Sequence, residues 1–347
     1  MTRHRPWLFL AALALVAWTT GSARAECEAI AFPFAPVNNP SRPWGTTDTG
    51  VVTSRFVTLD KAGEPPRFGN RHGVDLSRNN KPDYDMVKAC GGEFAFLKAD
   101  NTFLAHRTEL ERRGVVTFPY FYFAVPPSLR QARLYNGLNS SKQPEIDSFM
   151  ARFAALGEAQ AADLEIRLAA LRMPVIPNVS FVGLSGQIMA IDVEEKISDE
   201  GNSSKISRAY FGRFYARSVC SFLAKVREKH PELRPVIYTT PSTFGDYLNY
   251  AYPQDDACLH GLPVWLARTT SGGGDLIQNT GSPLDLYAQR LCLQSAGNRC
   301  IVHQYSHRAL LGKEPPLAEA PHLDVNRFFP VKVVPDGLNQ QFVRSGQ

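Results

Sequence analysis

Residues 188–194 read Ile-Met-Ala-Ile-Asp-Val-Glu, a short apolar run that ends in two carboxylates. An apolar run of this length is typical of a buried β-strand. On a strand, Asp192 and Glu194 point to the same face, with backbones about 6.6 Å apart. This spacing fits the roughly 5–5.5 Å between the carboxyl groups of retaining glycosidases. The alternative is a solvated acidic turn, because Glu195 and Lys196 follow.

Two carboxyl groups at this spacing repel each other when both are ionised. The better-desolvated one is therefore expected to keep its proton at neutral pH, which is what a general acid needs.

The same alternation of short apolar strands and amphipathic helices extends along the chain. Strands are expected at 72–76, 94–98, 115–123, 188–193, 235–239, 263–267, 300–305 and 323–325. Helices are expected at 83–90, 102–113, 145–171, 207–229, 243–250 and 283–293. This order predicts an α/β fold with parallel strands.

About eight strands in one chain favour a modified TIM-like (β/α) barrel that forms a single catalytic domain. A doubly wound open sheet is the alternative. No G-x-G-x-x-G sequence follows the first strand and no Walker A sequence occurs, which argues against nucleotide chemistry.

Residues 1–25 have the pattern of a signal peptide, with Arg3 and Arg5 before an apolar run and Ala23-Arg24-Ala25 as the cleavage site. We expect export to the periplasm or the medium, with no stable membrane anchor after cleavage; an uncleaved anchor is the alternative. Cleavage removes three arginines, so the formal charge falls from +5 to +2. This positive charge is too small to indicate nucleic-acid binding. The mature chain is expected to be a monomer.

The rest of the chain divides into three parts. Residues 26–70 are rich in Pro, Thr, Arg and Gly and are interpreted as an irregular extension. Residues 71–330 carry the strand and helix pattern, with a long insertion at about 124–186. Residues 331–347 are interpreted as a tail.

All six cysteines lie in the mature part, and an even count in an exported chain favours disulfides. Six cysteines allow 15 pairings. Cys292 and Cys300 are the safest pair, because only a short polar loop separates them.

Polar and aromatic side chains stand where the predicted strands end, and in a parallel barrel these ends meet at one rim. Carboxylates and aromatic rings on one rim describe a carbohydrate site, since rings stack on sugar faces and carboxylates supply acid–base chemistry. The candidate catalytic residues are Asp75, Asp192, Glu194 and Asp324. The candidate substrate-binding residues are Lys98, Tyr122, Tyr238, Trp265, Gln304 and Tyr305.

Several of these residues also have structural interpretations. Asp75 is a possible helix N-cap or hydrogen-bonded structural acid, and Asp324 has the same alternatives. Tyr238 and Trp265 are possible core aromatics. His303 and His307 are four residues apart on a strand-to-loop segment, so they would not share a face as helical metal ligands do. We expect neither a metal nor a cofactor.

The ordered motifs resemble glycoside hydrolase family 25, the Chalaropsis-type lysozymes. The resemblance spans about residues 72–329. It rests on Gly73-Val-Asp-Leu-Ser77, Asp83-Tyr-Asp-Met-Val-Lys88, Phe96-Leu-Lys-Ala99, Ile191-Asp-Val-Glu194, Pro235-Val-Ile-Tyr-Thr239, Val264-Trp-Leu-Ala267, Gln304-Tyr-Ser306 and Leu323-Asp-Val-Asn-Arg-Phe328.

The resemblance implies an N-acetylmuramidase that cleaves peptidoglycan. It makes Glu194 the general acid, and Asp192 the group that stabilises the anomeric centre, directly or by orienting the substrate N-acetyl group. Asp75 and Asp324 would complete the acidic floor, while Tyr122, Tyr238 and Gln304 would hold sugar.

The chain departs from the family at the rim. Lys98-Ala99 is followed by Asp100-Asn101-Thr102 instead of Thr-Glu-Gly, His303 stands where the family has Trp, and the insertion is long. The open alternatives are the same mechanism on another glycan and a catalytically silent glycan-binding protein. A zinc amidase is more remote.

Overall fold

The computed structural model describes residues 71–80, 82–89, 92–170, 187–199, 201, 203–267, 287, 291–294, 297–298, 300–309 and 323–328. The predicted signal peptide, the extension at 26–70 and the tail at 331–347 lie outside these residues. So do residues 171–186 of the insertion and most of the helix predicted at 283–293.

All eight predicted strands are present, with ends that differ by a few residues. They are β1 (Arg71–Leu76), β2 (Gly92–Lys98), β3 (Val116–Tyr122), β4 (Gln187–Asp192), β5 (Leu233–Thr239), β6 (Val264–Ala267), β9 (Cys300–Ala309) and β10 (Leu323–Phe328).

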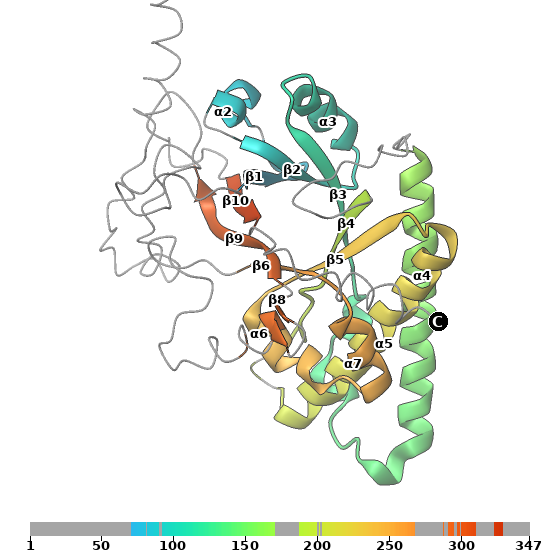
Figure 1. The fold of residues 1–347 in the computed structure, drawn as a ribbon. Coiled ribbons are helices and arrows are strands. Elements are labelled where there is room, and N and C mark those ends of the chain that lie inside the picture. Colours follow the sequence, from blue (N-terminus) through green and yellow to red (C-terminus); the bar gives the residue numbers. More distant parts are fainter. Residues whose placement is uncertain are drawn as a thin grey trace, which may run out of the picture.

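Hydrogen-bonded pairing joins the eight strands in the ring β1-β10-β9-β6-β5-β4-β3-β2 (Figure 1). Seven of them are parallel to one another, whereas β10 is antiparallel to both of its neighbours. The predicted α/β class is confirmed, and the curled parallel sheet is compatible with a TIM-like fold. A regular eightfold barrel is not formed, because one strand is reversed.

The inside of the ring is filled by apolar side chains at alternate strand positions. Phe94 and Phe96 on β2, Phe118 on β3, and Ile188 and Ala190 on β4 belong to this inner core. The intervening positions belong to a larger core that includes residues of the helices. The inner core therefore fixes which face of every strand points into the barrel.

The helices also follow the prediction closely. They are α2 (Tyr84–Ala89), α3 (Phe103–Glu111), α4 (Gln143–Ala170), α5 (Lys205–Lys229), α6 (Pro241–Asp246) and α7 (Pro253–His260). The single helix expected at 243–250 is divided into α6 and a 3₁₀ turn at Leu248–Tyr250. The short helix α7 was not predicted, because its eight residues carry no clear apolar stripe.

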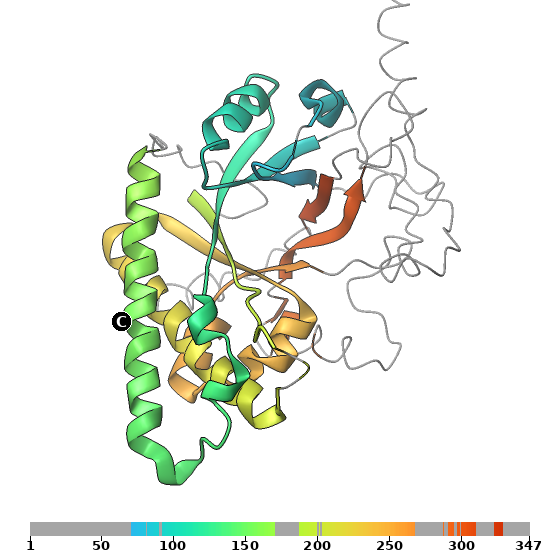
Figure 2. The ribbon, with the colours of Figure 1, turned by 180° about the vertical axis from the view of Figure 1, so that it is seen from behind.

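The insertion contributes the long helix α4, which runs beside α5 on the outside of the barrel (Figures 1 and 2). Gly157 is buried where the two helices meet. A Cβ atom at this position would lie 2.1 Å from the carbonyl oxygen of Ser218 on α5. The close approach of α4 therefore depends on the missing side chain.

We predict that Gly157→Ala lowers the free energy of unfolding by about 2 kcal/mol, because the helices must separate although alanine favours helix formation. Denaturation in urea measures this change. Ala162→Leu, at an exposed position of the same helix, should stay within about 0.5 kcal/mol of the parent. Equal stability of Gly157→Ala and the parent would show that α4 does not pack as described.

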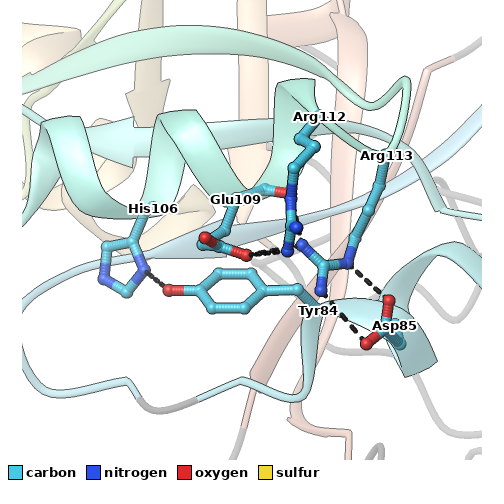
Figure 3. A network of polar contacts seen from close by, with 6 residues as sticks. All are labelled: Tyr84, Asp85, His106, Glu109, Arg112 and Arg113. Atoms are coloured by element: carbon cyan, nitrogen blue, oxygen red, sulfur yellow. Dashed lines mark hydrogen bonds and ion pairs between the residues drawn. The ribbon is translucent and has the colours of Figure 1, made fainter.

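A polar network fastens α2 and α3 to the loop that follows β1 (Figure 3). His106 Nε2 lies 3.2 Å from the carbonyl oxygen of Ser77, and its Nδ1 lies 2.9 Å from the Tyr84 hydroxyl. Because a carbonyl only accepts, Nε2 donates to Ser77. Burial lowers the pKa of His106, and in the neutral imidazole Nδ1 then accepts from the Tyr84 hydroxyl. Arg113 adds ion pairs to Asp85 and Glu109. The network holds the segment directly after Asp75.

Two disulfides lie within the described part of the chain. Cys292–Cys300 confirms the predicted pair, and the loop between them forms the two-stranded hairpin β7 (Leu293–Gln294) and β8 (Gly297–Asn298). Cys220–Cys258 ties α5 to α7. Cys27 and Cys90 lie outside the described residues. None of the described helices is long and apolar enough to cross a membrane.

Candidate active site

The predicted site residues continue the inward-facing series of the barrel core. On β2 and β3, the inner-core positions lead to Lys98 and Tyr122. On β4, Ile188 and Ala190 lead to Asp192, and Glu194 follows two residues later. Period-two alternation therefore places these polar groups directly after the last apolar layer, at the carboxyl ends of the parallel strands.

Strand register then brings the groups side by side. Tyr122 is the register partner of Asp192, Asp192 of Tyr238, and Tyr238 of Trp265. Asp75 is paired with Asp324 across β1 and β10. Tyr122, Asp192, Tyr238 and Trp265 thus form a row across four adjacent parallel strands. The pair Asp75 and Asp324, on β1 and the reversed strand β10, completes the set.

These residues surround one cavity of about 180 Å³. Its lining residues are Asp75, Lys98, Tyr120, Tyr122, Asp192, Glu194, Tyr238, Trp265 and Asp324. Eight of the ten candidates from the sequence are thus brought together. Gln304 is buried behind the cavity. Tyr305 belongs to β9, but its side chain lies outside what the structure describes.

Asp75 is held by side chains from the neighbouring strand β10 and from β9, the next strand of the ring. Its Oδ2 accepts hydrogen bonds from Asn326 Nδ2 at 2.8 Å and Gln304 Nε2 at 3.1 Å. Gln304 in turn accepts from the Tyr238 hydroxyl at 3.0 Å, and Asn326 accepts from Trp265 Nε1 at 2.8 Å. The N-cap interpretation of Asp75 is wrong, since its side chain lines the cavity, whereas the interpretation as a hydrogen-bonded acid is confirmed.

Trp265 is both a core aromatic residue and a residue of the cavity wall. It is 2% exposed and stacks on Phe96 with ring centroids 4.2 Å apart, so it is a core residue. Its edge also lines the cavity. Asn326 was quoted in a motif but not proposed as a site residue. Its position two residues after Asp324 on a strand was the signal that could have identified it.

Asp75 and Asp324 share one proton. Burial raises the pKa of Asp75, which hydrogen bonds from Asn326 and Gln304 oppose. Desolvation, followed by the charge of Asp75, raises the pKa of Asp324 to about 9. The hydrogen bond between the two carboxyls lowers the pKa of Asp75 and raises that of Asp324, so protonated Asp324 donates to Asp75 at neutral pH.

We predict that Asp324→Asn is increasingly stabilised relative to the wild type as pH rises above about 4, by up to about 1.4 kcal/mol per pH unit. An unfolded aspartate titrates near pH 3.9, so between about pH 4 and pH 9 the folded state binds more protons at this position than the unfolded state. The wild type therefore loses stability as pH rises through this range. Asparagine at position 324 keeps a hydrogen-bond donor toward Asp75 and has no carboxyl group to titrate.

Urea unfolding at pH 5, 7 and 8.5 measures the effect. Asp147→Asn, at an exposed position of α4, controls for the loss of one carboxyl group. Parallel stability curves for the wild type and Asp324→Asn would contradict the shared proton.

Asp192 and Glu194 differ in environment. Asp192 is 7% exposed, and its Oδ1 is buried without a hydrogen-bond partner among the described residues. Burial and then the charge of Glu194 raise the pKa of Asp192 well above its usual range, while Lys98 opposes the shift. Burial, followed by the charge of Glu195, also raises the pKa of the half-buried Glu194.

The rule that the better-desolvated carboxyl keeps its proton therefore selects Asp192. The family resemblance instead gives the acid role to Glu194. Both carboxyls have a raised pKa, so both are candidates to carry a proton at neutral pH.

Glu195 is not part of a solvated turn, which corrects the alternative raised for this segment. It is 5% exposed. Its carboxylate accepts hydrogen bonds from the Val125 amide and from the Arg130 guanidinium, and it is hydrogen-bonded to the Tyr122 side chain. The chain directly after Glu194 is thus anchored in the molecule. Because Arg130 and Val125 belong to the predicted insertion, the insertion supports the site.

We predict that Arg130→Met lowers the free energy of unfolding by about 2 kcal/mol, less than the roughly 3–5 kcal/mol of a fully buried pair. The Glu195 carboxylate would be left buried with one partner fewer, whereas the Arg130 side chain is 26% exposed. Thermal and urea unfolding test this. Arg133→Met, at an exposed position three residues away, should change little. Equal losses in the two variants would rule out a specific anchor.

Among the described residues, no group of three or more His, Cys, Asp or Glu side chains is placed to hold a metal ion.

No known family model matches the chain, and no curated protein matches it. Among solved structures, the Clostridium perfringens spore cortex lytic enzyme SleM is similar, with a TM-score of 0.44 and 16% sequence identity, covering 78% of this chain and 70% of that one. The catalytic domain of endolysin ply40 from bacteriophage P40 of Listeria monocytogenes has a TM-score of 0.41 and 15% identity, covering 78% and 97%. These similarities do not assign the chain to a family.

Proposed function

We propose that the chain is an exported glycoside hydrolase, a lysozyme-like N-acetylmuramidase that cleaves the β-1,4 bond between N-acetylmuramic acid and N-acetylglucosamine in peptidoglycan. The observation that carries the proposal is the single cavity in which four carboxyl groups from β1, β10 and the end of β4 meet tyrosine and tryptophan rings. The motifs behind the resemblance to glycoside hydrolase family 25 supply these same residues. The two described disulfides fit an exported protein.

Glu194 is proposed as the general acid. It is the less buried member of the Asp192–Glu194 pair, so a leaving-group oxygen has access to it. Its raised pKa keeps a protonated fraction available at neutral pH. Proton donation to the glycosidic oxygen lets the carbon–oxygen bond break while positive charge develops at the anomeric carbon.

Asp192 is proposed to act on the other side of the reacting centre. Asp192 lines the cavity, and its Oδ1 is buried without a hydrogen-bond partner among the described residues. A substrate amide N–H would satisfy this oxygen, which orients the N-acetyl group toward the anomeric carbon. Substrate binding then favours the ionised form of Asp192, so the proton is left on Glu194.

The remaining groups hold the sugar. Tyr238 is fixed by its hydrogen bond to Gln304 and by Trp265, whose ring centroid is 4.6 Å away. The Asp75–Asp324 pair presents carboxyl oxygens that accept hydrogen bonds from sugar hydroxyls, because its proton already lies between the two carboxyls. These fixed acceptors are pre-organised for a polar ring.

We predict that Glu194→Gln lowers the cleavage rate by about 10²–10⁴-fold with little change in melting temperature, because the side chain is nearly isosteric and the lost term is proton donation. The assay is mass spectrometry of purified peptidoglycan after incubation, which detects new reducing-end N-acetylmuramic acid. Glu158→Gln, at an exposed position of α4, is the matched control.

Asp192→Asn is a second arm of this assay. Loss of cleavage in Glu194→Gln alone would place proton donation on Glu194, and loss in both variants would give Asp192 its own role. Full activity of Glu194→Gln would overturn the mechanism. Intact glycan with every variant, wild type included, would overturn the proposed reaction.

A further inference from the structure

A second cavity of about 180 Å³ adjoins the candidate active site. Lys98 and Tyr122 line both cavities. The ammonium group of Lys98 lies 4.9 Å from the centroid of the Tyr122 ring, so this cation–π pair forms the shared wall. This second cavity is the side cavity of the site.

The opposite wall of the side cavity comes from the insertion helix α4. Gln160, Asp163 and Arg167 line it. They are spaced three and four residues apart, which places them on one face of the helix. The close packing of α4 on α5 at Gly157, within about three turns of these residues, sets the position of that face. The side cavity therefore exists because of the insertion.

Arg167 is held in place by three contacts. Its Nη1 donates to the carbonyl oxygen of Ala99 at 3.0 Å, and its Nε donates to Asp163 at 2.8 Å. The guanidinium carbon lies 5.7 Å from the centroid of the Phe121 ring. These contacts leave Nη2 without a hydrogen-bond partner among the described residues. A fixed cation with a free donor thus borders the cavity.

The charge of the side cavity is positive. Lys98 and Arg167 contribute two positive charges and Asp163 contributes one negative charge. Lys98 Nζ likewise donates no hydrogen bond to the residues that the structure describes. Two cationic donors that line one small cavity form a site for an anion, and Nη2 of Arg167 is available to a carboxylate.

We propose that the side cavity binds a carboxylate carried as a substituent on the sugar that occupies the candidate active site. The inference rests on the proposed function, because it assigns the cavity to the same substrate. It makes α4 and Arg167 a specificity element that favours acidic amino sugars over neutral ones. In peptidoglycan, the carboxylate is that of the lactyl group on N-acetylmuramic acid or that of a peptide attached to it.

The test compares two sugars that differ in this substituent. N-acetylmuramic acid and N-acetylglucosamine are titrated into ¹⁵N-labelled mature protein, and amide shifts give the dissociation constants. The wild type should bind N-acetylmuramic acid at least about 5-fold more tightly, and the difference should shrink in high salt. Arg167→Gln should lose the difference and keep the affinity for N-acetylglucosamine.

Arg152→Gln, at an exposed position of the same helix, is the matched control and should keep the difference. N-acetylmuramyl-L-alanine separates the two sources of the carboxylate. Weaker binding than N-acetylmuramic acid assigns the cavity to the lactyl carboxylate, and tighter binding assigns it to the peptide.

Equal binding of the acidic and neutral sugars by the wild type would overturn the inference, as would an unchanged preference in Arg167→Gln. The inference would also be overturned if neither N-acetylmuramic acid nor N-acetylglucosamine bound to the wild type. Peptidoglycan cleavage by the wild type would in each case leave the proposed function intact, so the two failures are distinguishable.

Discussion

The pairing of β1 with the reversed strand β10 is the constraint on which the rest of the structure depends. It closes the ring of strands and sets Asp75 opposite Asp324 in register. Two carboxyls forced together in a desolvated place cannot both ionise, so they share a proton. Asn326, on the same strand, connects Asp75 to Trp265. The pairing of β1 with β10 thus both closes the ring of strands and places Asp75 and Asp324 together in the cavity.

Strand alternation explains why an apolar core and a polar site occupy the same barrel. On β2, β3, β4 and β5 the inward positions belong to the inner core along the strand, and the last one at the carboxyl end lines the cavity. The cavity therefore lies directly above the last layer of the core. Lys98, Tyr122 and Tyr238 each follow, two positions later, a residue of the inner core. The insertion adds a second level of support, since Arg130 anchors Glu195 and α4 borders the side cavity.

The sequence predicted the strands, most helices and the residues of the cavity, because period-two and helical patterns are local signals. It did not predict the reversal of β10, which depends on pairing between residues about 250 positions apart. It also did not predict that Glu195 is buried, since the burial depends on Arg130 and Val125 from the insertion. The short helix α7 has too weak a pattern to be predicted. The relative burial of Asp192 and Glu194 likewise needed the three-dimensional arrangement.

The most direct test of the account is a pH titration of the side-chain carboxyl carbons by ¹³C NMR in the mature protein. The central claim is that the barrel register gathers four carboxyls into one desolvated cavity. The account predicts that Asp324 titrates near pH 9, with Asp192 and Glu194 also above their usual range. Titration of all four groups between about pH 3 and pH 5, as in solvated carboxylates, would contradict it.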